Sequence, residues 1–183
     1  MDAALVLTAT EFIDEWSVRL GYNDMQHAAA GGITRNCENV VRGVKDKHGC
    51  DPLDGWNQHV VGALGESAAA MCLDRYWSIG KMRAPDVWKY QVRSTTNTTN
   101  RLMLHKEDNG TDAFILVIGQ GPVFRLVGWL YGHEGKKPEY WCDPTKQGRH
   151  AFFVPREAMR PMPDRLRARP DLLSAPNSSK KEA

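Results

Sequence analysis

The apolar segment AFILVIG, residues 113–119, constrains the fold more than any other part of the chain. Seven consecutive apolar or small residues leave no polar face, and such a run is typical of a β-strand buried on both sides. Further strands are predicted over residues 89–95, 101–106, 123–131 and 151–154. The connections EDNGTD and GQGP are short turn sequences, which favour antiparallel neighbours.

The first part of the chain has helical rather than strand periodicity. The clearest helix is predicted over residues 56–77, where Val60, Leu64, Ala68 and Cys72 form one apolar row. Glu66 lies outside this row, beside small residues that allow a backbone or a ligand to approach the helix closely. This carboxylate is therefore a candidate for a buried functional role, with an exposed helix surface as the alternative.

Two weaker helical segments precede it, over residues 8–30 with an interruption at Gly21, and over residues 34–47. Gly31-Gly32 is expected to separate them, and HGCDPLDG after them is expected to form turns. Helices followed by strands predict one α+β domain over residues 1–169, in which N-terminal helices pack on a mixed, largely antiparallel sheet. Within it, residues 1–55 form a helical extension and 56–160 the core; residues 170–183 are predicted to be a disordered tail.

Composition excludes several classes of protein. The chain has 183 residues, 42% of them hydrophobic and 25% charged, and no apolar run approaches the ~20 residues that span a bilayer. The segment MDAALVLTATEF has an acidic residue where a signal peptide has Lys or Arg. We therefore expect a cytoplasmic protein with no membrane association. Four scattered cysteines predict free thiols, and His48 with Cys50 is too small a set to indicate a zinc site.

The segment PDVWKYQVRST, residues 85–95, has an unusual polar pattern. Side chains of a strand alternate between its two faces, so Gln91, Arg93 and Thr95 share one face. One interpretation is a half-exposed strand that shows polar groups to water. The other is a site that binds a cation and a phosphate, with Asp86 just before the strand.

With Glu66 added, this pattern resembles the PD-(D/E)XK nuclease superfamily, which has the restriction-endonuclease-like fold. The helix segment GALGES, the dipeptide PD and the tripeptide QVR match the helix Glu, the Asp and the acidic-x-Lys element of that superfamily. The order of elements over residues 35–160 is similar to that of uncharacterised phage-encoded members, which would place the protein in an infected host cell.

The resemblance implies a DNA nuclease that uses Mg²⁺ or Mn²⁺. Glu66, Asp86, Gln91 and the carbonyl of Val92 would surround the metal, and Arg93 would contact the phosphate. The nucleophile would be a water made more acidic by the metal.

Two residues depart from the superfamily pattern. Gln91 replaces an acidic residue, and its carbonyl oxygen can ligate Mg²⁺ without adding charge, so metal affinity should fall. Arg93 replaces Lys and stays protonated, so it cannot act as a general base, although it can stabilise charge on a phosphate. An inactive member of the fold that binds DNA or protein therefore remains an alternative.

Further residues are candidates for contact with nucleic acid. This set contains Arg93, Thr95, Arg101, His105 and Lys106. A polar hairpin loop at STTNTTN and an exposed strand after it explain the same residues without a ligand. Asp112 is interpreted as a turn residue. Two further partners stay open: a second copy of the chain, and a protein of the host or of the phage.

Overall fold

The computed structural model describes residues 14–44, 52–77, 85–97, 99–144, 146 and 148–163, with no side chains described for 52–54. The predicted tail 170–183, the start of the predicted helix 8–30, and His48 and Cys50 lie outside these residues. The described elements are β1 (Ser17–Arg19), α1 (Tyr22–Val41), α2 (Pro52–Cys72), β2 (Tyr90–Thr95), β3 (Leu102–Leu104), β4 (Ala113–Gly119), β5 (Val123–Tyr131), α3 (Gly132–Gly135), β6 (Trp141–Cys142) and β7 (Ala151–Val154). Single 3-10 turns cover Pro138–Tyr140 and Arg156–Ala158.

The strands form two sheets. Sheet A has the order β1-β5-β4-β2, and sheet B has the order β3-β7-β6. Strand β2 runs parallel to β4, and every other pairing is antiparallel. The α+β class and the mixed, largely antiparallel pairing are therefore confirmed. GQGP joins an antiparallel pair as predicted, whereas EDNGTD joins β3 to β4, which belong to different sheets.

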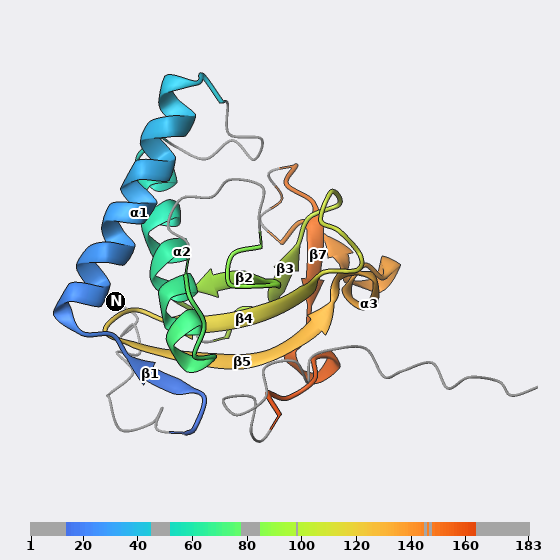
Figure 1. Ribbon diagram of the computed structural model, residues 1–183. Helices are drawn as coiled ribbons and strands as arrows, with labels where there is room; N and C mark the ends of the chain where they lie inside the picture. Colours follow the sequence, from blue (N-terminus) through green and yellow to red (C-terminus); the bar gives the residue numbers. More distant parts are fainter. Residues whose placement is uncertain are drawn as a thin grey trace, which may run out of the picture.

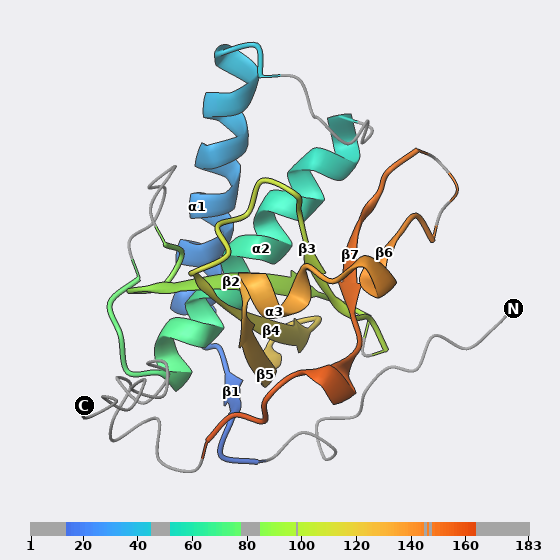
Figure 2. The same ribbon diagram turned by 90° about the vertical axis from the view of Figure 1, so that its right-hand side faces the viewer.

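Strand β4 lies at the centre of the molecule, and all seven of its residues are buried. Ala113, Ile115 and Val117 pack with residues of α2 in a helix-side core. The alternate residues of β4 pack with β3 and β7 in a sheet-side core (Phe114, Leu116 and Ile118). Sheet A is thus covered by helices on one face and by sheet B on the other, as the views in Figures 1 and 2 show. The prediction from the apolar run is confirmed.

Helix α1 is continuous across Gly31-Gly32, so the predicted break there is wrong. A Cβ on Gly32 would lie 2.6 Å from the backbone oxygen of His59 in α2. The glycine is needed because the two helices cross with their backbones in contact, and α1 and α2 lie side by side in Figure 1. The helix begins after Gly21, whose N–H donates to the Asp24 carboxylate at 3.0 Å.

Three other element boundaries differ from the predictions. Residues 17–19 form β1 instead of part of a helix, because their backbone pairs with β5 in register Ser17 to Arg125. Helix α2 begins at Pro52 within the predicted turn, since proline is tolerated in the first turn of a helix, and it ends at Cys72. Strand β3 covers only Leu102–Leu104 of the predicted 101–106. Among the described residues, no helix combines the length and the apolar character needed to cross a membrane.

Candidate functional site at the edge of β2

Strand β2 divides its side chains between the two faces of sheet A. Tyr90 and Val92 are buried in the helix-side core. The guanidinium of Arg93 lies over the Phe114 ring of the sheet-side core, 5.1 Å from its centroid. Gln91 and Arg93 therefore point away from α2, and the predicted sharing of one face by these two side chains is confirmed.

Asp86 lies at the outer edge of β2, on the side opposite β4. The chain folds back there, because Val87 and Tyr90 exchange backbone hydrogen bonds of 3.1 and 2.9 Å. The Asp86 carboxylate then accepts the N–H of Val92 at 2.8 Å. A residue in a strand directs its N–H and its C=O to the same side. The carbonyl of Val92 therefore lies at this edge too, where Arg93 donates to it at 3.4 Å.

Glu66 lies on α2 and is only 6% exposed. Its two carboxylate oxygens accept hydrogen bonds of 2.7 and 2.5 Å from the Arg35 guanidinium of α1. The Trp77 indole donates a third, at 2.9 Å. The helix comes close to β2 here, since a Cβ on Gly65 would lie 1.8 Å from the Ser94 hydroxyl. A buried Glu66 and a close approach through small residues agree with the sequence-based interpretation.

The carboxylates of Glu66 and Asp86 influence each other electrostatically. Burial and the nearby charge of Glu66 raise the pKa of Asp86 from 3.8 to about 6, against the opposing effects of the Val92 N–H, Arg93 and Arg35. Burial alone lowers the pKa of Arg35, but the hydrogen bond to Glu66 and the charges of Glu66 and Asp86 raise it overall. Two carboxylates that share a buried region in this way form an environment suited to a cation.

Arg93 forms an ion pair with Asp108, which no sequence pattern marks as part of a site. Its Nη2 lies 2.9 and 3.0 Å from the two oxygens of Asp108, while its Nη1 lies 4.0 Å from Asp86. Gln91 donates its amide N–H to Asp112 at 3.1 Å, which leaves the amide oxygen as its potential metal ligand. Asp112 forms the predicted turn, with its N–H on the carbonyl of Asn109 at 3.2 Å.

The predicted metal ligands thus have different positions. Glu66 on α2 and Asp86 at the edge of β2 influence each other electrostatically, and Asp86 contacts the backbone of Val92. The Gln91 side chain is directed to the other face. All four offer oxygen, which Mg²⁺ and Mn²⁺ prefer. No group of three or more His, Cys, Asp or Glu residues with metal-binding geometry occurs among the described residues. The Glu66 carboxylate already accepts three N–H groups, two of them on Oε2, so one lone pair of Oε1 is left for a metal while Arg35 and Trp77 keep their contacts.

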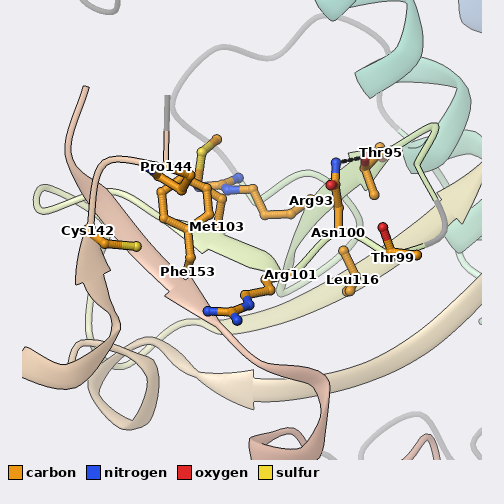
Figure 3. A pocket seen from close by; sticks show the side chains of 11 residues that line it. Arg93, Thr95, Thr99, Asn100, Arg101, Met103, Leu116, Cys142, Pro144 and Phe153 are labelled. Atoms are coloured by element: carbon orange, nitrogen blue, oxygen red, sulfur yellow. Dashed lines mark hydrogen bonds between the residues drawn. The ribbon is translucent and has the colours of Figure 1, made fainter. Parts of the chain in front are cut away.

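Three of the predicted nucleic-acid contacts line one cavity between the sheets. Arg93, Thr95 and Arg101 line a pocket of about 700 Å³ together with Met103 and Phe153 (Figure 3). His105 and Lys106 do not line it. The N–H of His105 donates to Asp108 at 2.9 Å, and the carbonyl of Lys106 accepts the ammonium of Lys136 at 2.8 Å.

Sequence reasoning missed Arg35, Trp77 and Asp108. Nothing near these residues in the chain marks them, because each acts through a partner brought close only by folding. Searches against protein families, curated proteins and solved structures find no match to this chain.

Proposed function

We propose that this protein is a divalent-metal-dependent DNA nuclease of the PD-(D/E)XK type, which hydrolyses phosphodiester bonds. The observation that supports it most is the raised pKa of Asp86, about 6, which follows from burial and from the nearby negative charge of Glu66. Two carboxylates that repel each other, Glu66 buried and Asp86 partly buried, are costly to the fold, and a bound dication would relieve that repulsion.

Each residue has a distinct role in this proposal. Glu66, Asp86 and the Val92 carbonyl would hold Mg²⁺ or Mn²⁺, which would supply positive charge that acidifies the attacking water. The Gln91 side chain, on the other face of β2, would keep its contact with Asp112. Arg93 remains protonated and donates N–H groups to a phosphate oxygen, where it stabilises the charge that develops during the reaction. To do so, Arg93 exchanges its contact with Asp108 for the phosphate.

A second candidate is a member of the same fold that binds DNA or protein without cleavage. The contacts of Glu66 favour it, because Arg35 already supplies a positive charge in bidentate geometry at a residue 6% exposed. Arg93 likewise already forms an ion pair with the Asp108 carboxylate. In this candidate the two arginines replace the metal as structural counter-charges.

Cleavage assays with single-stranded, duplex and branched DNA separate the two candidates. We expect Mg²⁺- or Mn²⁺-dependent cleavage that is abolished in the double variant Glu66→Ala/Asp86→Ala. The matched control is Glu15→Ala/Glu107→Ala, which removes two exposed carboxylates and should leave cleavage unchanged. Circular dichroism establishes that each variant is folded.

Binding without cleavage by the wild-type chain would refute the nuclease proposal and support the second candidate. The variant Gln91→Glu/Arg93→Lys then identifies the cause. Cleavage acquired only by this variant would show that these two positions make the natural site inactive.

A further inference from the structure

The pocket between the two sheets has the chemistry of a site for one nucleotide. Its volume of about 700 Å³ lies within the ~300–1,000 Å³ that is usual for ligand pockets. Met103 on β3 and Phe153 on β7 are register partners, so their side chains lie next to each other on one face of sheet B. These two side chains give one end of the pocket an apolar surface against which the flat face of a base can pack (Figure 3).

The other side of the pocket is polar and carries positive charge. Thr95, Thr99 and Asn100 contribute hydroxyl and amide groups, and the Asn100 amide donates to the Thr95 hydroxyl at 2.7 Å (Figure 3). Among the described residues that line the pocket, none is Asp or Glu. Arg101 is exposed and has no ion pair among the described residues, so its charge is available to a phosphate.

Two buried N–H groups near this pocket lack a partner among the described residues. One is the Nε of Arg93, which lines the pocket, and the other is the Nη2 of Arg156. Arg156 is close by, because its Nε donates to the Asn100 carbonyl at 3.2 Å. Buried donors without acceptors are unfavourable, and an anionic ligand would satisfy such groups.

We propose that this pocket receives an unpaired base of single-stranded nucleic acid, with the adjacent phosphate on Arg101. The inference rests on the proposed function in taking nucleic acid as the substrate. Bases of a duplex are paired and stacked, so only an unpaired base can insert its face between Phe153 and the threonines. The pocket therefore selects single-stranded or frayed substrates over intact duplex.

Arg93 connects the pocket to the carboxylate site. It lines the pocket, and its Nη1 lies 4.0 Å from Asp86. A strand with one base in the pocket consequently passes its backbone along the outer edge of β2, toward Asp86 and Glu66. The pocket would fix which phosphodiester is presented for cleavage.

Fluorescence anisotropy in EDTA tests the pocket independently of cleavage. The probes are a fluorescein-labelled dT12 strand and a labelled blunt hairpin duplex. We expect the wild-type chain to bind dT12 at least tenfold more tightly than the hairpin. Phe153→Leu keeps an apolar side chain but removes the ring, and it should weaken dT12 binding about tenfold, as loss of a stacked base does.

Arg101→Ala should also weaken binding, and it should reduce the slope of log K against log salt concentration by about 0.7, the contribution of one phosphate contact to a single strand. The matched control is Arg19→Ala, which removes an exposed arginine of β1. It should leave dT12 binding unchanged.

Competition separates the base from the phosphate. We expect dTMP to displace dT12 at lower concentration than inorganic phosphate or a phosphoserine peptide does. Equal competition by the three compounds would overturn the inference, because it would mean that no base is recognised. So would equal affinity for dT12 and the hairpin, or wild-type binding by both Phe153→Leu and Arg101→Ala.

The two proposals fail separately. A chain that prefers dT12 in EDTA but never cleaves DNA supports the pocket and refutes the nuclease. A chain that cleaves duplex with no preference for single strands refutes the pocket and supports the nuclease.

Discussion

Replacing Asp86 with Asn should stabilise the fold at neutral pH. Asn resembles the protonated carboxyl in shape and keeps an oxygen that can accept the Val92 N–H, which Asp86 accepts at 2.8 Å. It removes the negative charge that burial and Glu66 disfavour. Most substitutions of buried polar residues destabilise a protein, so a gain in stability at this position would be specific to a site under electrostatic strain.

The magnitude follows from the raised pKa of Asp86. The difference between 3.8 and about 6 corresponds to at most about 3 kcal/mol, because a tenfold change in proton affinity is worth about 1.4 kcal/mol. The folded state binds this proton more tightly than the unfolded state does. The protonated Asp86 carboxyl therefore makes its full contribution to the free energy of unfolding below pH 3.8, and this contribution is lost as the pH rises through about 6. The advantage of Asp86→Asn should be about 3 kcal/mol at pH 7.5 and about half of that at pH 5.

Urea denaturation at pH 5.0 and pH 7.5 in EDTA measures both values. Asp74→Asn is the matched control, since Asp74 is exposed, and its free energy of unfolding should change by less than about 0.5 kcal/mol. Mn²⁺ should stabilise the wild-type chain and not Asp86→Asn, because only the former keeps both carboxylates. A loss of stability in Asp86→Asn at pH 7.5, or a gain that does not depend on pH, would refute the electrostatic account of this site.

Three further predictions test other contacts of the fold. Arg35→Gln leaves the Glu66 carboxylate without its bidentate partner, so it should lower the free energy of unfolding by about 3–5 kcal/mol in EDTA. Mn²⁺ should restore part of this loss, and an unchanged urea midpoint would contradict the buried ion pair. Gly65→Ala should destabilise the fold by about 1–3 kcal/mol because the added methyl group meets the Ser94 hydroxyl, whereas Gly62→Ala on the open side of α2 should stabilise it by up to about 1 kcal/mol. Equal effects of the two substitutions in thermal unfolding would refute the close approach of α2 to β2. Hydrogen bonds to Arg160 hold the pKa of Glu134 below 4.5, so the ionised carboxylate stabilises the fold above that pH. Glu134→Gln should therefore lower the free energy of unfolding in urea at neutral pH, and its difference from the wild-type chain should shrink as the pH falls toward 3.5.

Local patterns of the sequence determined several parts of this structure. Seven apolar residues without a polar face predicted that β4 is buried on both sides, and side-chain alternation predicted that Gln91 and Arg93 share a face of β2. The small residues around Glu66 predicted a close approach to α2. These predictions succeed because periodicity depends on neighbours within a few positions along the chain.

Only the tertiary structure decided which groups meet. Strand β2 pairs in parallel with β4, although β3 separates the two in the chain and belongs to the other sheet. Helix α1 continues through two glycines because α2 needs the space. The partner of Glu66 is Arg35, 31 positions away in the chain, and the partner of Arg93 is Asp108. No local pattern encodes such pairs, because the energy of a buried charge depends on what the whole fold places beside it. The sequence alone therefore determines which residues can form a site, and folding determines the charges that surround each of them.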